Sequence, residues 1–391
     1  MYLDYTPHEK ALRAELRAYF ERLMTAELEQ EIAETESGGP LYTRALRQMG
    51  RDGWLGIGWP RRYGGQERPP IEQFIFFDEV QRAGYPIPLL TLNTVGPTLI
   101  EHGSDAQRDR FLPKILSGEL HFSIGYTEPQ AGTDLAALKT TAVRDGDHYV
   151  INGQKAFTSL AEHADYIWLA ARTDPAAPKH KGISILIVDR SLPGIKLVPV
   201  QTLGDNRVSS TFFDDVRVPV SMRVGAENQG WKLITTQLNH ERVALACSGK
   251  AEAHLEDVVE WARTTDAPEG GRVIDRPWVQ LTLARCRARL EALRLLNWRL
   301  AWELTQNDLN AADASTVKVY GTELFVEVYR AFMEVLGEAG VLKNGSRDAF
   351  LAGRIEQMYR WAYVVTFGGG VNEIQREIIA TAGLGMPRTG R

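Results

Sequence analysis

The texture of the sequence changes twice along the chain, from helical to β-type and back, and this order limits the folds that 391 residues can adopt. Up to about residue 120, apolar residues recur with the period of amphipathic helices. From His121 to about Pro219 the segments are short, β-branched and aromatic, with turn residues between them. After Gly230 the helical pattern returns. We expect an N-terminal helical domain over 1–120, a middle β-domain over 121–228 and a C-terminal helical domain over 229–391.

Punctuation and periodicity predict individual elements. Thr6-Pro7 predicts a helix start, with threonine as the cap and proline at the first helical position. Further helices are expected over Ile71–Ala83, Leu90–His102 and Ala106–Leu116. The expected strands are His148–Asn152, followed by a turn at Asn152-Gly153, then Tyr166–Ala171, Ile183–Val188 and Ile195–Val200. Composition predicts a loop over Thr264–Gly271, which interrupts the C-terminal helices.

Composition argues against several classes of function. The net charge is −5 and basic residues form no block, so we expect no nucleic-acid partner. Cys247 and Cys286 lack C-x-x-C spacing, and the eight histidines do not pair at ligand spacings, so we expect buried thiols, no disulfide and no metal site. The first twenty residues carry charges throughout, which argues against a signal peptide or membrane span. We therefore expect a cytoplasmic protein.

Two segments of the β-domain carry candidate binding groups. Gly125–Asp134 reads GYTEPQAGTD, in which two threonines bracket a proline turn and a glycine. Backbone and side-chain donors there could converge on a polar or anionic ligand, although the pattern alone also fits an ordinary turn. Asn152–Ser159 reads NGQKAFTS, and strand alternation puts Phe157 and Ser159 on one face. A flat ring then lies beside a hydroxyl, although a strand with a core aromatic reads the same way.

Together these segments, their spacing and the helix–β–helix order resemble the acyl-CoA dehydrogenase family over essentially the whole chain. The resemblance implies a mainly α fold with a central β-domain: an N-terminal helical domain, a β-barrel-like domain and a C-terminal four-helix bundle. It also implies FAD against the β-domain, because a pyrophosphate needs convergent donors and the flavin ring a dry, flat surface. By this resemblance Ile124, Tyr126 and Thr127 contact the ring or its edge, Gly132 and Thr133 the ribityl–pyrophosphate part, and Phe157 and Ser159 the ring.

The family's reaction is α,β-dehydrogenation of an acyl-CoA thioester, in which a carboxylate takes the α-proton and a hydride passes to flavin N5. Many members carry the base near the C-terminus, before an I-Q-R triplet, but counting back from Arg376 puts Gly369 there. A smaller group of relatives carries it as Glu-Arg within an apolar helix after the β-domain, which matches Glu241-Arg242 in LNHERVALACSG. We therefore expect Glu241 to be the catalytic base. Leu238 would share its helical face and raise its pKa by desolvation, and Arg242 would support the helix or the substrate pocket.

The resemblance gives the glycine segment a second role. The backbone N–H of Gly369, with a ribityl hydroxyl, would bind the thioester carbonyl, where negative charge develops during proton removal. Gly370, Val371 and Asn372 would approach the flavin, because the glycine triplet permits close backbone contact. A flexible connection between two helices remains the alternative.

Two segments depart from the family pattern. Homotetrameric relatives lend an Arg-x-x-Phe-Gly segment and a Gln-x-x-Gly-Gly segment to the flavin site of the neighbouring subunit. Here Trp261–Gly271 lacks the first, and Glu334–Glu338 replaces the second with two carboxylates, which would repel a pyrophosphate. This resembles the base-bearing subunit of the heteromeric steroid side-chain acyl-CoA dehydrogenases of actinobacteria.

The expected partners follow from that resemblance. They are an acyl-CoA substrate with a steroid side chain, a second, unlike acyl-CoA dehydrogenase subunit in an α2β2 assembly, and an electron acceptor such as an electron-transfer flavoprotein. Three alternatives stay open: a branched or long-chain fatty acyl-CoA dehydrogenase, a relative whose reduced flavin reacts with oxygen, and a non-catalytic subunit that has lost its flavin.

Overall fold

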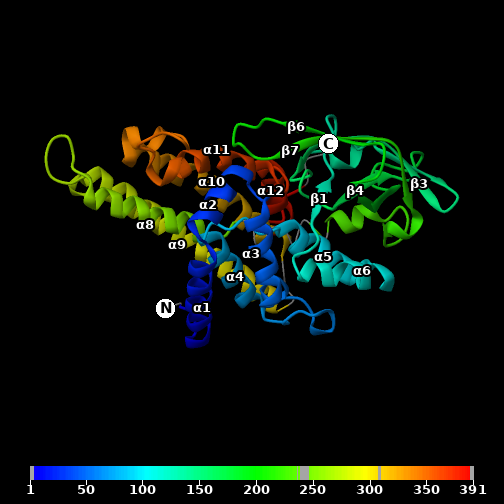
Figure 1. Ribbon diagram of the computed structural model, residues 1–391, viewed down its shortest axis with the longest axis horizontal. Coiled ribbons are helices and arrows are strands. Elements are labelled where there is room, and N and C mark those ends of the chain that lie inside the picture. The colour runs from blue at the N-terminus through cyan, green and yellow to red at the C-terminus, as the bar shows by residue number, and fades with distance from the viewer. Residues whose placement is uncertain (1–3, 236, 238–245, 307–309, 388–391) are drawn as a thin grey trace.

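The computed structural model describes residues 4–235, 237, 246–306 and 310–387. Helices precede and follow the strands of one sheet along the chain, and the sheet lies at the right of Figure 1. This order confirms the expected fold class. The N-terminal helices are α1 (Pro7–Leu23), α2 (Ala26–Thr35), α3 (Pro40–Arg51), α4 (Pro70–Arg82), α5 (Gly96–His102) and α6 (Asp105–Leu116). α1 begins as predicted, because Thr6 and Glu9 form a reciprocal capping box around Pro7. A π-helical stretch, Thr91–Val95, precedes α5, where a single helix was expected.

The β-domain is an eight-stranded sheet in the order β6-β7-β3-β2-β4-β5-β8, with β1 paired to β4. Its strands are β1 (Phe122–Gly125), β2 (Thr141–Asp145), β3 (His148–Ser159), β4 (Tyr166–Arg172), β5 (Ile183–Asp189), β6 (Ile195–Val200), β7 (Val208–Pro219) and β8 (Arg223–Val224). β2 and β4 pair only at Thr141 and Arg172, so the sheet bends there. Apolar side chains from both halves, among them Tyr149, Leu186 and Phe213, form one buried cluster.

The turn expected at Asn152-Gly153 is wrong, because β3 runs through it as one strand of twelve residues. The N-G pair instead forms a bulge against β7, where Gly153 takes a φ of +149°. Asn152 holds the bulge through its side chain, which donates to Asp215 Oδ1 and accepts from the Asp215 N–H, both at 2.9 Å. The hairpin turn lies earlier, between β2 and β3, at Gly146. Positive φ at a glycine thus served a bulge and not a chain reversal.

The C-terminal helices are α8 (Gly249–Thr264), α9 (Pro277–Thr305), α10 (Ala311–Leu336), α11 (Arg354–Phe367) and α12 (Asn372–Ile378). The predicted loop Thr264–Gly271 is the hairpin that joins α8 to α9 at the far left of Figure 1. α4 connects the N-terminal helices to this bundle, where the Gly249 N–H donates to Asp78 Oδ1 at 2.8 Å. A Cβ at Gly249 would lie 2.2 Å from the Asp78 carbonyl oxygen, so this contact requires glycine.

The surface and the core each bear on the sequence expectations. Cys247 and Cys286 are both buried, as predicted. Within the described ranges, no helix is long and apolar enough to cross a membrane.

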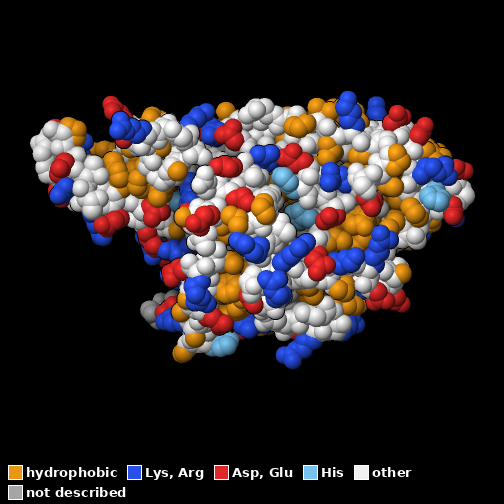
Figure 2. Space-filling view, in the orientation of Figure 1, with side chains coloured by type: hydrophobic (Ala, Val, Ile, Leu, Met, Phe, Trp, Pro, Cys, Tyr) orange, Lys and Arg blue, Asp and Glu red, His pale blue; other side chains and the backbone are white. Residues whose placement is uncertain are grey.

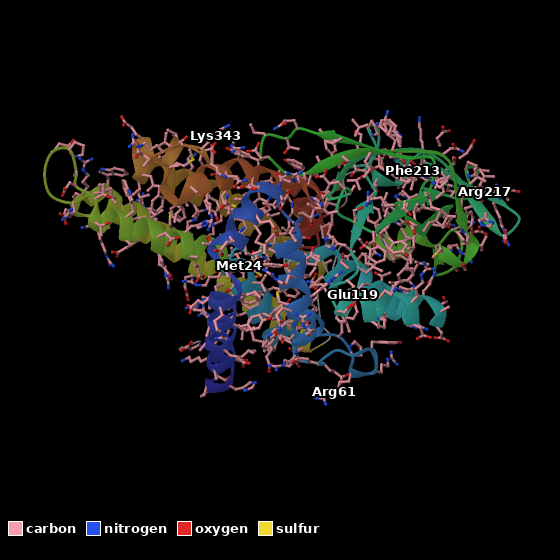
Figure 3. All side chains as sticks on the ribbon, viewed as in Figure 1. Met24, Arg61, Glu119, Phe213, Arg217 and Lys343 are labelled. Carbon is pink, nitrogen blue, oxygen red and sulfur yellow. The ribbon has the colours of Figure 1, made fainter. Side chains whose placement is uncertain are left out.

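Basic side chains gather over α3, where Arg44, Arg47 and Arg51 are exposed (Figure 2). These arginines are not consecutive in the sequence, so they do not form a basic block there. On β7, Phe213 enters the β-domain core while Arg217 donates to Asp145 Oδ2 at 2.8 Å (Figure 3).

Candidate active site

A buried ion pair joins the two motifs of the β-domain. Glu128 of the first motif and Lys155 of the second lie 2.8 Å apart, and both side chains are buried. Lys155 also donates to the Tyr126 carbonyl at 3.0 Å, while the Glu128 carboxylate accepts the N–H groups of Lys139 at 2.6 Å and Thr140 at 2.8 Å. The loop between β1 and β2 is therefore fixed near its start and at its end.

The charges of this pair are set by competing effects. Burial lowers the pKa of Lys155 to about 8, although Glu128 opposes the shift. Burial also disfavours ionisation of Glu128, but the Lys155 ammonium and the N–H donors outweigh it, and the pKa of Glu128 is lowered. Both groups are charged at neutral pH, so each side chain keeps the other from being a buried, uncompensated charge.

Three of the residues predicted to contact the flavin expose an aromatic ring and two hydroxyls at the surface of the β-domain, and these are Phe157, Ser159 and Thr133. Phe157 has a φ of +54° at a second bulge of β3, and 62% of its surface is exposed. Ser159 and Thr133 are exposed too, and a Cβ at Gly132 would meet nothing within 4 Å. Phe157 is thus not the core aromatic that strand alternation alone allowed. A bare aromatic ring beside hydroxyl donors and an open glycine fits a flavin and its polar tail.

The other predicted flavin contacts lie where β1 leaves the sheet. Ile124 and Thr127 are half-buried, and the Thr127 carbonyl accepts the Ala156 N–H at 2.8 Å. Tyr126 belongs to a row of side chains linked by hydrogen bonds. The Trp168 indole N–H donates to the Tyr126 hydroxyl at 3.1 Å, and that hydroxyl donates to Gln237. Gln237 in turn donates to Thr98 Oγ1 of α5 at 3.0 Å. This row connects the β-domain, the N-terminal helices and the segment that precedes the predicted base.

The predicted base and substrate contacts, Glu241, Arg242 and Leu238, lie outside the described residues. The residues that flank them are buried at defined places. Gln237 bonds Tyr126, as above, and Ala246 accepts a hydrogen bond from Asn297 Nδ2 of α9 at 3.0 Å. A Cβ at Gly321 of α10 would lie 2.7 Å from the Ala246 side chain. The described residues on either side of 238–245 are therefore held by different parts of the fold, Gln237 by the β-domain and α5, and Ala246 by α9 and α10.

The glycine segment forms the tight connection between α11 and α12. Gly369 and Gly370 have φ values of +66° and +101°, and a Cβ at Gly370 would lie 2.7 Å from Gln375 Nε2. Val371 caps α12, and Asn372 is buried with its side chain bonded to α10. The backbone, and not the Asn372 side chain, is thus the part of this segment open to a ligand. The positive φ values and the buried Asn372 favour a specified turn over a flexible connection.

A contact between the β-domain and α11 brings these parts toward one another. Ser159 pairs with Val208 at the start of β7. The loop just before β7 reaches α11, where Arg360 donates to Asp205 Oδ2 at 2.6 Å and to the Leu203 carbonyl. The Phe157–Ser159 end of β3 is therefore tied, through this loop, to the helix that leads into the glycine segment.

Sequence reasoning missed Glu128, Lys155 and Lys318, whose buried side chains hold the site in place. Lys318 of α10 donates to the carbonyls of Thr366 and Gly370, at 2.9 and 2.7 Å, and to Asn372 Oδ1 at 2.6 Å. A signal existed in each case, since Glu128 and Lys155 lie within the two motifs and Lys318 interrupts an apolar helical stretch. Only the fold reveals what these charges meet.

The segments that depart from the family pattern lie at the end of the bundle. Glu334 is exposed near the end of α10, 3.7 Å from Arg330, and Glu338 follows in a short helical turn. In the hairpin Thr264–Gly271, Arg272 lies 2.7 Å from Asp266. The hairpin lies at the far left of Figure 1, at the opposite end of the molecule from the β-domain.

Comparisons with known proteins agree with this architecture. Three family models match: the N-terminal domain of acyl-CoA dehydrogenase over residues 6–119, its middle domain over 123–216 and its C-terminal domain over 228–384. Among curated relatives, acyl-CoA dehydrogenases FadE26 and FadE29 of Mycobacterium tuberculosis are 52% and 50% identical, each over the full length of both chains.

Solved structures extend the likeness to three dimensions. A chain of the Tcur3481-Tcur3483 steroid ACAD is 53% identical, with a TM-score of 0.94 and full coverage of both chains. A chain of the ChsE4-ChsE5 complex from Mycobacterium tuberculosis is also 53% identical over both full lengths, with a TM-score of 0.93. Together the fold, the motifs and these matches show that the chain belongs to the acyl-CoA dehydrogenase family of FAD-dependent oxidoreductases.

Proposed function

We propose that this chain catalyses α,β-dehydrogenation of a steroid side-chain acyl-CoA, with Glu241 as the base. The observation that carries the proposal is the anchoring of the Glu241 segment. Gln237 bonds Tyr126 at the flavin-facing end of β1, and Ala246 packs against α10, the helix that holds the glycine segment. Glu241 belongs to the eight residues, 238–245, that connect these two points in the sequence, which supports its proposed role as the base of this site.

The chemistry requires two groups from this chain. The proposed role of the Glu241 carboxylate is to take the weakly acidic α-proton, and the sequence pattern that puts the apolar Leu238 three residues before it favours a desolvated base. The Gly369 N–H donates to the thioester carbonyl oxygen as negative charge develops there. FAD, when bound, would supply the acceptor for the hydride that leaves the β-carbon. Phe157, Ser159, Thr133 and Gly132 hold the flavin, and Arg242 supports the substrate pocket.

The steroid substrate is supported by the solved relatives. One similar structure is the Tcur3481-Tcur3483 steroid ACAD, and another is the ChsE4-ChsE5 complex. The similarity to each extends over the whole chain. A branched or long-chain fatty acyl-CoA is the second candidate, favoured by the position of Glu241 alone. A non-catalytic subunit fits less well, because the flavin-facing residues and the buried frame behind them are intact.

We also propose that an unlike subunit of the same family completes the site in an α2β2 assembly. Glu334 and Glu338 put two carboxylates where relatives carry Gln-x-x-Gly-Gly, and the hairpin Thr264–Gly271 lacks the arginine of the Arg-x-x-Phe-Gly segment that pairs with a pyrophosphate. The long helix α9 exposes several large apolar side chains, which are Trp278, Leu281, Leu295 and Trp302. Such surface favours a partner over solvent. The two reducing equivalents then leave through an electron acceptor such as an electron-transfer flavoprotein.

The test is co-expression of this chain with an unlike family member that carries the two lent motifs, followed by a panel of acyl-CoA thioesters under anaerobic conditions. We expect flavin bleaching at about the rate of turnover with steroid side-chain thioesters. Glu241→Gln should lower that rate by about a thousandfold or more while FAD stays bound. Glu334→Gln serves as the matched control and should leave the rate within about twofold. A Glu241→Gln rate within about tenfold of the unmodified pair would show that another group is the base.

A further inference from the structure

Lys318 is a buried ammonium whose bonds go to the segment between α11 and α12. Its side chain is fully buried within α10. It donates to the Thr366 carbonyl near the end of α11, to the Gly370 carbonyl in the glycine segment and to Asn372 Oδ1 at the start of α12. One ammonium therefore bonds the segment before, within and after the glycine triplet.

This arrangement sets the shape of the segment. A buried charge is tolerated only where hydrogen bonds replace its hydration, and charge-assisted bonds of 2.6–2.9 Å are among the stronger ones in proteins. Since two of the acceptors are backbone carbonyls four residues apart, the ammonium fixes the distance across the turn. Gly369 lies between those two carbonyls, so its own orientation follows from theirs.

The neighbouring residues of α10 hold the other side of the segment. Ser315 donates to Gln375 Oε1 at 2.9 Å, and Asn372 donates to Thr322 Oγ1 and Glu323 Oε1, each at 3.1 Å. These residues recur at helical spacing with Lys318, so one face of α10 contacts the glycine segment and α12 along their length. Among them, Lys318 is the side chain that bonds the backbone of the glycine segment itself.

We propose that Lys318 is a positioning residue, which holds the Gly369 N–H in the orientation that the thioester carbonyl requires. The inference rests on the proposed function, in which Gly369 donates to that carbonyl. Its physical basis is that a hydrogen-bond donor stabilises developing charge only if it is fixed before the reaction begins. Lys318 touches the segment and not the reacting atoms.

The test compares Lys318→Met, which keeps the length of the side chain and removes its donors, with Lys343→Met, an exposed lysine on the same bundle (Figure 3). In the FAD-loaded pair we expect Lys318→Met to lower kcat by about 10- to 100-fold with KM within about threefold. In the full chain without substrate, amide hydrogen exchange over residues 364–376 should accelerate by about tenfold, with the rest of the bundle unchanged. Lys343→Met should change neither.

Each outcome decides the proposal. Unchanged exchange over 364–376, or accelerated exchange with kcat within about twofold, overturns it. If Lys318→Met is not recovered folded, Lys318→Gln, which keeps a neutral donor on a shorter side chain, should give the same pattern with a smaller loss of kcat. A pair that oxidises no acyl-CoA in its unmodified form refutes the proposed function instead, and the exchange measurement still judges the role of Lys318 in holding the segment.

Discussion

The two parts of the site are each held by a buried lysine, but the lysines bond to different kinds of group. On the β-domain side, Lys155 pairs with the Glu128 carboxylate and through it fixes a long loop. On the bundle side, Lys318 bonds two backbone carbonyls and an amide oxygen of a short glycine turn. The first arrangement stabilises a surface on which a cofactor can lie. The second orients a backbone, so we expect substitutions there to act on turnover more than on stability.

The largest expected effect is on stability, at the Glu128–Lys155 pair. Glu128→Gln leaves a buried ammonium without its carboxylate and should cost about 3–5 kcal/mol in free energy of unfolding. The double variant Glu128→Gln/Lys155→Met should lose about 2 kcal/mol less unfolding free energy than the sum of the losses in the two single variants. Denaturant unfolding of the full chain measures this.

The control for that experiment lies in the same motif. Asp134 pairs with Lys179 at the surface, and both side chains are about half exposed. Asp134→Asn should cost less than about 1 kcal/mol, because solvent screens exposed pairs. Equal losses of unfolding free energy in Glu128→Gln and Asp134→Asn would mean that burial does not increase the cost of breaking the Glu128–Lys155 pair.

A second prediction concerns the glycine turn. Gly370→Ala puts a Cβ at 2.7 Å from Gln375 Nε2, at a residue with a φ of +101°. The strain should displace the turn and lower kcat by about tenfold or more, while FAD content stays within about twofold. Gly345→Ala, also at positive φ but with open space around it, separates backbone strain from displacement of the site. A Gly370→Ala enzyme with full turnover would break the proposed division between the two parts.

Substitutions on the predicted flavin-facing surface should lower FAD affinity more than turnover, in contrast to substitutions in the glycine turn. Ser159→Ala and Thr133→Val each remove one exposed hydroxyl, so each should weaken FAD binding by about three- to tenfold. Turnover at saturating FAD should change less than affinity does. Flavin titration of the assembled pair, followed by fluorescence quenching, measures both variants. Affinities equal to that of the unmodified pair would mean that the flavin lies elsewhere.

The smallest expected effect is on the pH dependence of stability. Burial lowers the pKa of Lys155 to about 8, while an unfolded chain has the ordinary lysine value of about 10.4. Between these values the unfolded chain binds more protons, so the contribution of Lys155 to stability rises with pH from about 8 to 10.4 and is absent below that window. The difference in unfolding free energy between the unmodified chain and Lys155→Met should rise by on the order of 1 kcal/mol per pH unit there. A flat difference would contradict the assigned shift.

The sequence was sufficient for the helix–β–helix order of the fold, whereas the flavin contacts stay predictions. The Thr6 cap is local chemistry, whereas the exposure of Phe157 depends on a bulge of β3 that alternation does not predict. The Asn152-Gly153 turn was wrong because the same residues serve a bulge, and only the pairing with β7 decides between the two. Lys155 and Lys318 were missed because their partners are distant in sequence. Glu241, Arg242 and Leu238 stay predictions.

The most direct test of the account is the FAD content of this chain, purified alone and with an unlike partner that carries the two lent motifs. Glu334 and Glu338 are carboxylates, and the hairpin Thr264–Gly271 has no arginine for a neighbour's pyrophosphate, so a site made from this chain alone lacks charge-assisted bonds worth roughly 1.5–3 kcal/mol each. We predict that the chain alone binds FAD about a hundredfold more weakly, and that the pair contains one FAD for each two unlike subunits. A stable homotetramer with one tightly bound FAD in every subunit would contradict the account.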